Sequence, residues 1–110
     1  KMKRYCLALD LKNDPLLISK YIDHHKKVWP EIKSSIKDSG IIAMEIYQVA
    51  DRLFMIMETM DDFSFEKKHK MDSQNPFVMK WEELMSQFQK SISAAQPGEK
   101  WILMDKIFKL

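Results

Sequence analysis

The order of expected elements along this chain of 110 residues, strand, helix, strand, strand, helix, strand, predicts a ferredoxin-like α+β sandwich. Two observations favour this fold class. Apolar residues recur with a period of about 2 in some segments and about 3.6 in others. Two of the strand-like segments are separated by only three residues, as in an antiparallel hairpin. We therefore expect a single domain over residues 2–110, with helices on one face of an antiparallel sheet.

A strand and a long helix are expected in the first part of the chain. Residues 4–10 form the strand-like run, and the polar pair at 13–14 supplies a cap for a helix that begins at residue 14 or 15, since Pro15 suits a first helical turn. The apolar spacing of the helix continues until Gly40, a good helix terminator. Pro30 has no amide hydrogen, so we expect the helix to bend there.

The hairpin strands are expected at 41–48 and 52–58. The second of them is apolar on both faces, which is typical of a central strand in a sheet that is covered on both sides. One layer of helices covers only one face. We therefore expect a homodimer in which the sheets of the two copies face each other.

Two helices and a last strand are expected in the final part. A short helix should start at Asp61, Asp62 or Ser64 and run to about Met71, and a longer one should run from Pro76, capped by Asn75, to about Ser91. A turn then leads to a strand over 101–108. The longer helix is expected to bury one stripe of side chains, formed by Phe77, Trp81, Leu84 and Phe88.

Composition excludes several classes of partner and location. The 18 basic and 16 acidic residues are interspersed, so we expect no nucleic-acid or membrane partner. No apolar run approaches the roughly 20 residues that cross a bilayer, and no secretory leader is visible. Cys6 is the single cysteine and cannot form an internal disulfide. We expect a cytoplasmic protein.

The motifs of most cofactor and metal sites are missing. The chain has only two glycines and no Gly-rich phosphate loop, and it has no cysteine pair, HExxH sequence or nucleophile elbow. We therefore expect neither a cofactor nor a metal.

Tyr21, His25 and Trp29 recur every fourth residue, which places a phenol, an imidazole and an indole on one helical stripe. The rest of that face is aliphatic, so two proton-handling groups point inward. His24 lies about 100° around the helix and points elsewhere. A lone inward histidine is ordinarily a core residue bonded to a backbone carbonyl. The phenol one turn away equally favours a small polar pocket with aromatic walls, for which Trp81 is a candidate.

The run from Tyr21 to Ile32, YIDHHKKVWPEI, resembles the signature of the L-rhamnose mutarotase family, and the later segments extend the resemblance to nearly the whole chain. The resemblance implies a dimeric ferredoxin-like fold, no cofactor, and interconversion of the anomers of a 6-deoxy-L-sugar. It also implies that His25 is catalytic, that Tyr21 contacts the substrate, and that Trp81 corresponds to the first of two tryptophans that the family has in the later helix.

The chain departs from this family pattern at two positions. It has Glu82 in place of the second tryptophan, and Met44 in place of a tyrosine. Both are therefore candidates for substrate binding and for a changed sugar preference. A carboxylate at Glu82 can hydrogen-bond a hydroxyl against which an indole would only pack, which favours L-fucose over L-rhamnose as the sugar.

Mutarotation is a reaction that these residues could carry out. Opening a hemiacetal needs a base for the anomeric hydroxyl and an acid for the ring oxygen. His25, with an ordinary pKa of about 6.5, can work in both directions, and Tyr21 can orient a hydroxyl or relay a proton. Two alternatives stay open: a cofactor-free monooxygenase of the dimeric α+β barrel type, and a non-catalytic module that binds a small ligand.

Overall fold

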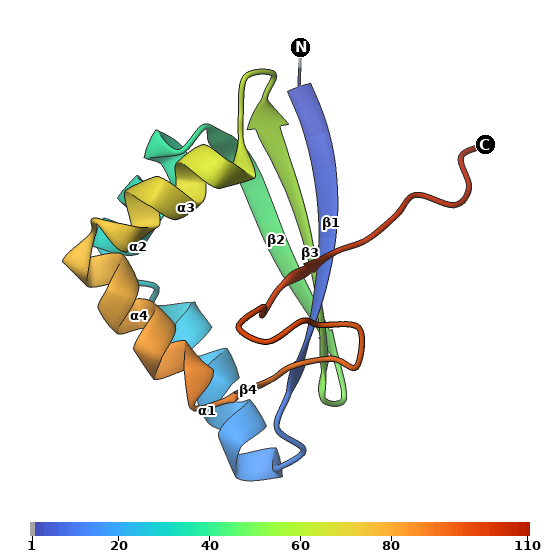
Figure 1. Cartoon of the computed structure of the whole chain (residues 1–110). Coiled ribbons are helices and arrows are strands. Elements are labelled where there is room, and N and C mark those ends of the chain that lie inside the picture. The colour runs from blue at the N-terminus through green and yellow to red at the C-terminus, as the bar shows by residue number, and fades with distance from the viewer. Residues whose placement is uncertain (1) are drawn as a thin grey trace.

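The computed structural model describes residues 2–110 as a sheet with a layer of helices beside it (Figure 1). The helices come in two pairs, each placed between strands, so the expected alternation of strands and helices is retained. In chain order the elements are β1 (Met2–Leu11), α1 (Pro15–Lys26), α2 (Pro30–Asp38), β2 (Ile41–Val49), β3 (Arg52–Met60), α3 (Phe65–Ser73), α4 (Pro76–Ser86), β4 (Gln89–Lys90) and β5 (Ile102–Leu103).

The sheet is antiparallel, with the strand order β2, β3, β1, β4, and β5 also pairs with β1. Strand β3 lies between β2 and β1, as its apolar residues on both faces predicted. Leu7 pairs with Met55 and Leu9 pairs with Leu53, which directs these four side chains to the same face of the sheet. All four are buried, so this face forms the core.

All four helices lie on one side of the sheet, as expected (Figure 1). Two hydrophobic clusters join the layers. The first consists of Leu11, Tyr21, Ile32, Leu53, Val78, Trp81, Met85 and Phe88. The second consists of Leu7, Ile41, Met55, Met57 and Phe63. Among the described residues, no helix has both the length and the apolar character that a bilayer-spanning segment requires.

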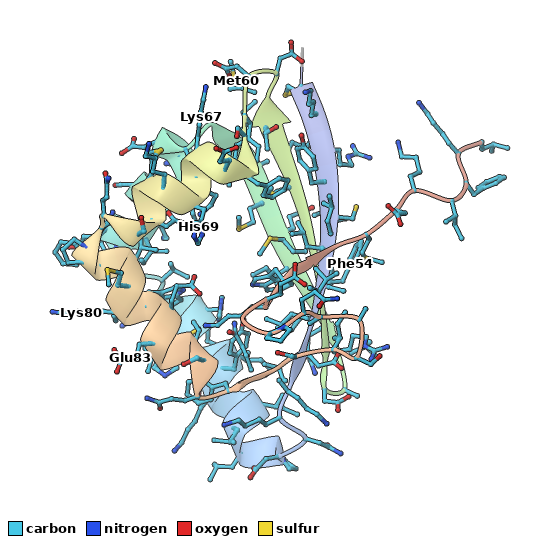
Figure 2. All side chains as sticks on the ribbon, viewed as in Figure 1. Phe54, Met60, Lys67, His69, Lys80 and Glu83 are labelled. Carbon is cyan, nitrogen blue, oxygen red and sulfur yellow. The ribbon has the colours of Figure 1, made fainter. Side chains whose placement is uncertain are left out.

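The opposite face of the sheet carries no described helix (Figure 1). The side chains of Cys6, Ala8, Phe54 and Ile56 alternate with the core residues of β1 and β3 and therefore point to this opposite face. All four residues are only half-buried. Figure 2 shows Phe54 on the side of the sheet away from the helices.

Two helices take the place of the single bent helix expected from the sequence. Helix α1 ends at Lys26 and α2 begins at Pro30, with residues 27–29 outside both. Pro30 occupies the first turn of α2, where its missing amide hydrogen breaks no helical hydrogen bond. At the other end of α1, Asp14 is the cap, as expected. Its carboxylate accepts hydrogen bonds from two amides of the first turn, at 2.9 and 3.3 Å.

Helix α4 is shorter than expected. It ends at Ser86 and not near Ser91, because the chain turns and then pairs with β1 as β4, with Gln89 opposite Leu11. A residue that pairs across a sheet cannot also continue a helix, since its backbone groups bond to another strand. The expected helix therefore contains a short strand that the sequence pattern did not reveal.

The buried stripe of α4 also differs from the expected one. Trp81 lies at its centre and is 8% exposed, but Phe77 is 46% exposed, whereas Val78 and Met85 are buried. Helix α4 packs against α2 and α3 as well as facing the sheet. Because two neighbouring helices add a second contact direction, Val78 and Met85 take the buried positions expected for Phe77 and Leu84, while Trp81 belongs to both the expected and the observed stripe.

The last strand is much shorter than the expected 101–108. Of residues 101–108, only the two residues of β5 pair with β1, and Met104 adds one hydrogen bond from its amide to the carbonyl of Cys6, at 2.8 Å. Beyond it the chain leaves the sheet (Figure 1), with Ile107 95% and Phe108 76% exposed. A strand persists only while a neighbouring backbone pairs with it, so the apolar pattern of this tail did not suffice to make one.

Candidate active site

A cavity of about 530 Å³ lies between the helices and the sheet, lined by members of both hydrophobic clusters. Helix α1 contributes Tyr21 and His25, α4 contributes Trp81 and Glu82, and β2 contributes Met44. The fold thus brings together all five residues that the sequence singled out. The rest of the lining is mostly apolar, with Leu7, Val28, Ile32, Ile36, Ile46, Met55, Met57, Phe65, Val78, Met85 and Trp101 beside the polar Ser35, Lys68 and Gln89.

Tyr21 and His25 form the polar part of the cavity wall. They lie one turn apart on α1, with ring centroids 4.4 Å apart. Nδ1 of His25 is 2.8 Å from the backbone carbonyl oxygen of Tyr21. A carbonyl oxygen can only accept, so Nδ1 carries the hydrogen and donates it. In the neutral imidazole, Nε2 is therefore an unprotonated acceptor, which is the form that a general base requires.

The surroundings of His25 favour its neutral form. Burial lowers the pKa of His25 below its ordinary value of 6.5, and the nearby His24 lowers it further. The hydrogen bond to the Tyr21 carbonyl acts in the opposite direction, because it favours the protonated imidazole. With the lowering effects larger, the imidazole is neutral around pH 7.

The hydroxyl of Tyr21 has the opposite role to Nε2 of His25. Nε2 of Gln89 lies 3.4 Å from Tyr21 Oη. An amide nitrogen only donates, so Oη accepts this bond and its own hydrogen stays free for another acceptor. Burial raises the pKa of Tyr21, the Gln89 bond lowers it, and the charge of Glu82 raises it. The phenol therefore stays protonated, and α1 presents one donor and one acceptor, a turn apart.

Aromatic rings form a second part of the wall. Trp81 meets His25 edge to face, with centroids 5.7 Å apart. Trp29, the third member of the helical stripe, packs edge to face on Trp81 at 5.1 Å. Trp29 belongs to the partly buried layer around the first cluster and supports Trp81. Such edge-to-face pairs hold the two indoles in fixed orientations.

Glu82 lies at the rim of the cavity, with its side chain 54% exposed. Its Oε2 is 3.5 Å from Nζ of Lys100, and the same Nζ donates to the backbone carbonyl of Glu82 at 3.3 Å. Figure 2 shows the neighbouring Glu83 pointing away from the sheet. Of the two adjacent carboxylates, only Glu82 lines the cavity, and Lys100 holds it there.

Among the lining residues that the sequence did not single out are three polar ones and one aromatic one: Ser35, Lys68, Gln89 and Trp101. Gln89 fell inside the expected helix, and Trp101 was the start of the expected last strand. Lys68 lies in a run of charged residues that is typical of a solvated helix face, but its Nζ is paired with Asp72 and only partly exposed. No local spacing marks these residues, because each reaches the cavity from a different element.

The other two histidines do not line this cavity. His24 packs on Phe88, with ring centroids 5.5 Å apart. His69 is exposed on α3 and is labelled in Figure 2. Within residues 2–110, no three His, Cys, Asp or Glu side chains gather in a way that could hold a metal ion.

Comparisons with known proteins place the chain in a family. Residues 4–110 match the family described as L-rhamnose mutarotase. A relative named L-fucose mutarotase, from Xanthomonas campestris pv. campestris, is 40% identical over 111 residues, covering 99% of this chain and 89% of the relative. The crystal structure of an L-rhamnose mutarotase from Formosa agariphila matches with a TM-score of 0.72 at 21% identity, over 98% of each chain.

A second solved structure confirms the fold class. A dimeric ferredoxin-like protein from an uncultured marine organism matches with a TM-score of 0.63 at 16% identity, covering 87% of this chain and 97% of the other. At this level of identity the likeness concerns the fold alone. The ferredoxin-like α+β class predicted from the order of elements is therefore confirmed.

The protonation of His25 can be checked directly. We expect ¹⁵N-resolved NMR to show the neutral ring with its hydrogen on Nδ1, and a titration midpoint below 6.5 because burial disfavours the cation. The unfolded chain then binds the proton more readily than the folded one, so stability falls as pH drops below about 6.5. The variants His25→Gln and His24→Gln, one at a time, assign the signals among the three histidines. A midpoint at or above 6.5, or a hydrogen on Nε2, would contradict this description.

Proposed function

The chain belongs to the L-rhamnose mutarotase family of isomerases, and on that premise we propose that it interconverts the α and β anomers of 6-deoxy-L-hexoses, with L-fucose preferred over L-rhamnose. One observation carries the proposal. An acceptor, Nε2 of His25, and a donor, the hydroxyl of Tyr21, lie one helical turn apart on the wall of one cavity. Opening and closing a hemiacetal needs this pair of opposite proton roles.

The reaction moves two protons and breaks one bond. Nε2 of His25 takes the proton of the anomeric hydroxyl while Tyr21 gives its proton to the ring oxygen. The bond between the anomeric carbon and the ring oxygen breaks, and the oxygen that lost its proton forms the carbonyl. The open-chain aldehyde turns and the former ring hydroxyl attacks its other face. That hydroxyl returns a proton to the Tyr21 phenolate, and the imidazolium returns one to the carbonyl oxygen.

The burial of both groups suits this exchange. The lowered pKa of His25 keeps the base free near neutral pH, and the raised pKa of Tyr21 keeps the acid protonated. During opening, the imidazolium and the phenolate carry opposite charges on rings whose centroids are 4.4 Å apart. Opposite charges attract more strongly in a partly buried site than in water, so each transfer favours the other.

The cavity suits a small sugar. Its volume of about 530 Å³ lies within the roughly 300–1,000 Å³ typical of ligand pockets. Trp81 offers an aromatic surface for the C–H face of a sugar ring. The methionines of the sheet side, Met44, Met55 and Met57, are flexible and apolar, and they can accommodate the methyl group of a 6-deoxy sugar.

The two alternatives are not favoured. Unrelated functions share this fold, so the fold by itself does not distinguish a mutarotase from a cofactor-free monooxygenase or a non-catalytic ligand-binding module. The family match covers residues 4–110 and is the stronger argument. A module that only binds a ligand also has no need of a base and an acid beside each other.

The preference for L-fucose rests on Glu82 and on the named relative. L-Fucose and L-rhamnose differ in the orientation of the hydroxyls at carbons 2 and 4. One oxygen of Glu82 is paired with Lys100, which leaves the carboxylate able to accept a sugar hydroxyl. An epimer that does not make this bond loses about 1–1.5 kcal/mol, the net contribution of one hydrogen bond, because water can reach the half-exposed carboxylate. The 40% identical relative named L-fucose mutarotase supports the same preference.

We also propose that the protein is a homodimer whose sheets face each other. The face opposite the helices carries the half-buried Phe54 and Ile56, with the exposed Tyr47 and Val49 beside them on β2. A second copy related by a twofold axis would cover this apolar face with the same face of its own sheet. The solved neighbour described as a dimeric ferredoxin-like protein supports this arrangement.

Removing the imidazole tests the chemistry. We expect His25→Ala to lower the rate of anomer exchange by about 10²- to 10⁴-fold, because it removes a general base, and Tyr21→Phe to lower it less, because the packing is kept. Magnetisation-exchange NMR of L-fucose and L-rhamnose measures the rate, with the spontaneous rate subtracted. His24→Ala is the matched control and should be nearly silent. A His25→Ala variant as fast as the parent protein would make His25 structural.

Replacing Glu82 tests the sugar preference. Glu82→Trp puts in place the tryptophan that the family pattern has, so we expect the ratio of L-rhamnose to L-fucose exchange rates to rise by about tenfold, one hydroxyl bond's worth. Glu83→Trp is the control, since Glu83 points away from the sheet (Figure 2). If the ratio of the two exchange rates is the same in the parent and in Glu82→Trp, the Glu82 carboxylate does not determine the sugar preference.

Light scattering tests the dimer. At micromolar concentration we expect twice the mass of one chain, and we expect Phe54→Asp to halve it, because a carboxylate in the interface would be buried without a partner. Phe77→Asp, an equivalent change at a phenylalanine 46% exposed on α4, should stay dimeric. A parent protein with the mass of one chain would refute the facing sheets.

A further inference from the structure

The amide of Gln89 has one end occupied and one end free. Its Nε2 donates to the hydroxyl of Tyr21 at 3.4 Å. Its Oε1 is buried and, within residues 2–110, is the one buried side-chain polar atom without a hydrogen-bond partner. Gln89 also lines the cavity beside Tyr21. An unpaired acceptor thus lies next to the donor that serves the reaction.

The backbone of Gln89 is held in place, so its side chain has little freedom to turn Oε1 toward solvent or another donor. Gln89 pairs with Leu11 of β1, and the residue before it, Phe88, is buried in the first hydrophobic cluster. An apolar side chain here would remove the unpaired acceptor, but it would also leave the hydroxyl of Tyr21 without its donor. Buried acceptors are nearly always paired in folded proteins, because they lose their bonds to water. An exception that borders a ligand cavity is explained if the ligand brings the missing donor.

We propose that Oε1 of Gln89 is a sugar-binding group, which accepts a hydrogen bond from a ring hydroxyl of the substrate other than the anomeric one. The inference rests on the proposed function and deepens it. One amide then binds both Tyr21 and the sugar. Its Nε2 donates to the Tyr21 hydroxyl, and its Oε1 accepts a hydrogen bond from the sugar ring. Gln89 positions the sugar so that the free hydrogen of Tyr21 points at the ring oxygen.

A double-mutant cycle between protein and substrate tests the bond. Gln89→Met keeps the length of the side chain and removes both amide groups. We expect it to lower kcat/KM for L-fucose by about tenfold, a typical loss for one such bond. The same effect of Gln89→Met on kcat/KM is then measured with 2-, 3- and 4-deoxy-L-fucose. For one of these sugars it should be small, because that sugar already lacks the hydroxyl that Oε1 binds. If the loss is equal for L-fucose and all three deoxy sugars, the proposal is wrong.

Stability separates binding from a structural role. Gln89→Met removes a buried unpaired acceptor and also the bond that Nε2 donates to Tyr21 Oη. These two effects oppose each other, so its melting temperature should stay close to that of the parent. A variant that melts lower and loses the same factor with every sugar would make Gln89 structural and overturn the proposal. Gln87→Met, at an exposed glutamine two residues earlier, is the control. A parent protein that does not accelerate anomer exchange would instead refute the proposed function.

Discussion

The site depends on how the helices are held against the sheet. Two hydrophobic clusters join the layers, one around Trp81 and the other around Phe63. Side chains from both clusters line the cavity between them. Protein interiors are normally packed without space for a ligand. Here two clusters support the helices at separate places, and the space between them can stay open.

The chemistry depends on one helical turn. Because residues four apart lie above one another on a helix, Tyr21 and His25 share a wall, and the carbonyl of Tyr21 is within reach of Nδ1 of His25. That bond places the hydrogen of the imidazole on Nδ1. The bond from Gln89 occupies Oη of Tyr21 as an acceptor, so the hydroxyl hydrogen is free to donate elsewhere. Backbone geometry thus sets the hydrogen position on the proposed base, while a residue from another element sets that on the proposed acid.

The two faces of the sheet have different roles. The face toward the helices carries Leu9 and Leu53, both almost fully buried, and holds the site. The other face carries Phe54 and Ile56, which one copy of the chain leaves half-exposed. The tail after β5 adds Ile107 and Phe108, also exposed. The apolar character of β3 serves the fold on one face, and on the other face it is the basis of the dimer proposed above.

The sequence by itself determined whatever depends on neighbours along the chain. The order of elements, the Asp14 cap and the Tyr21 and His25 stripe follow from spacing within one turn or one strand. The central place of β3 follows from its apolar faces. Tertiary structure decided where separate elements meet. Gln89 lies in a strand and not in the expected helix, because its backbone pairs with β1. Phe77 is exposed because α4 also packs on α2 and α3. The tail beyond β5 has strand-like spacing, but strand formation needs a paired backbone, which no local pattern supplies.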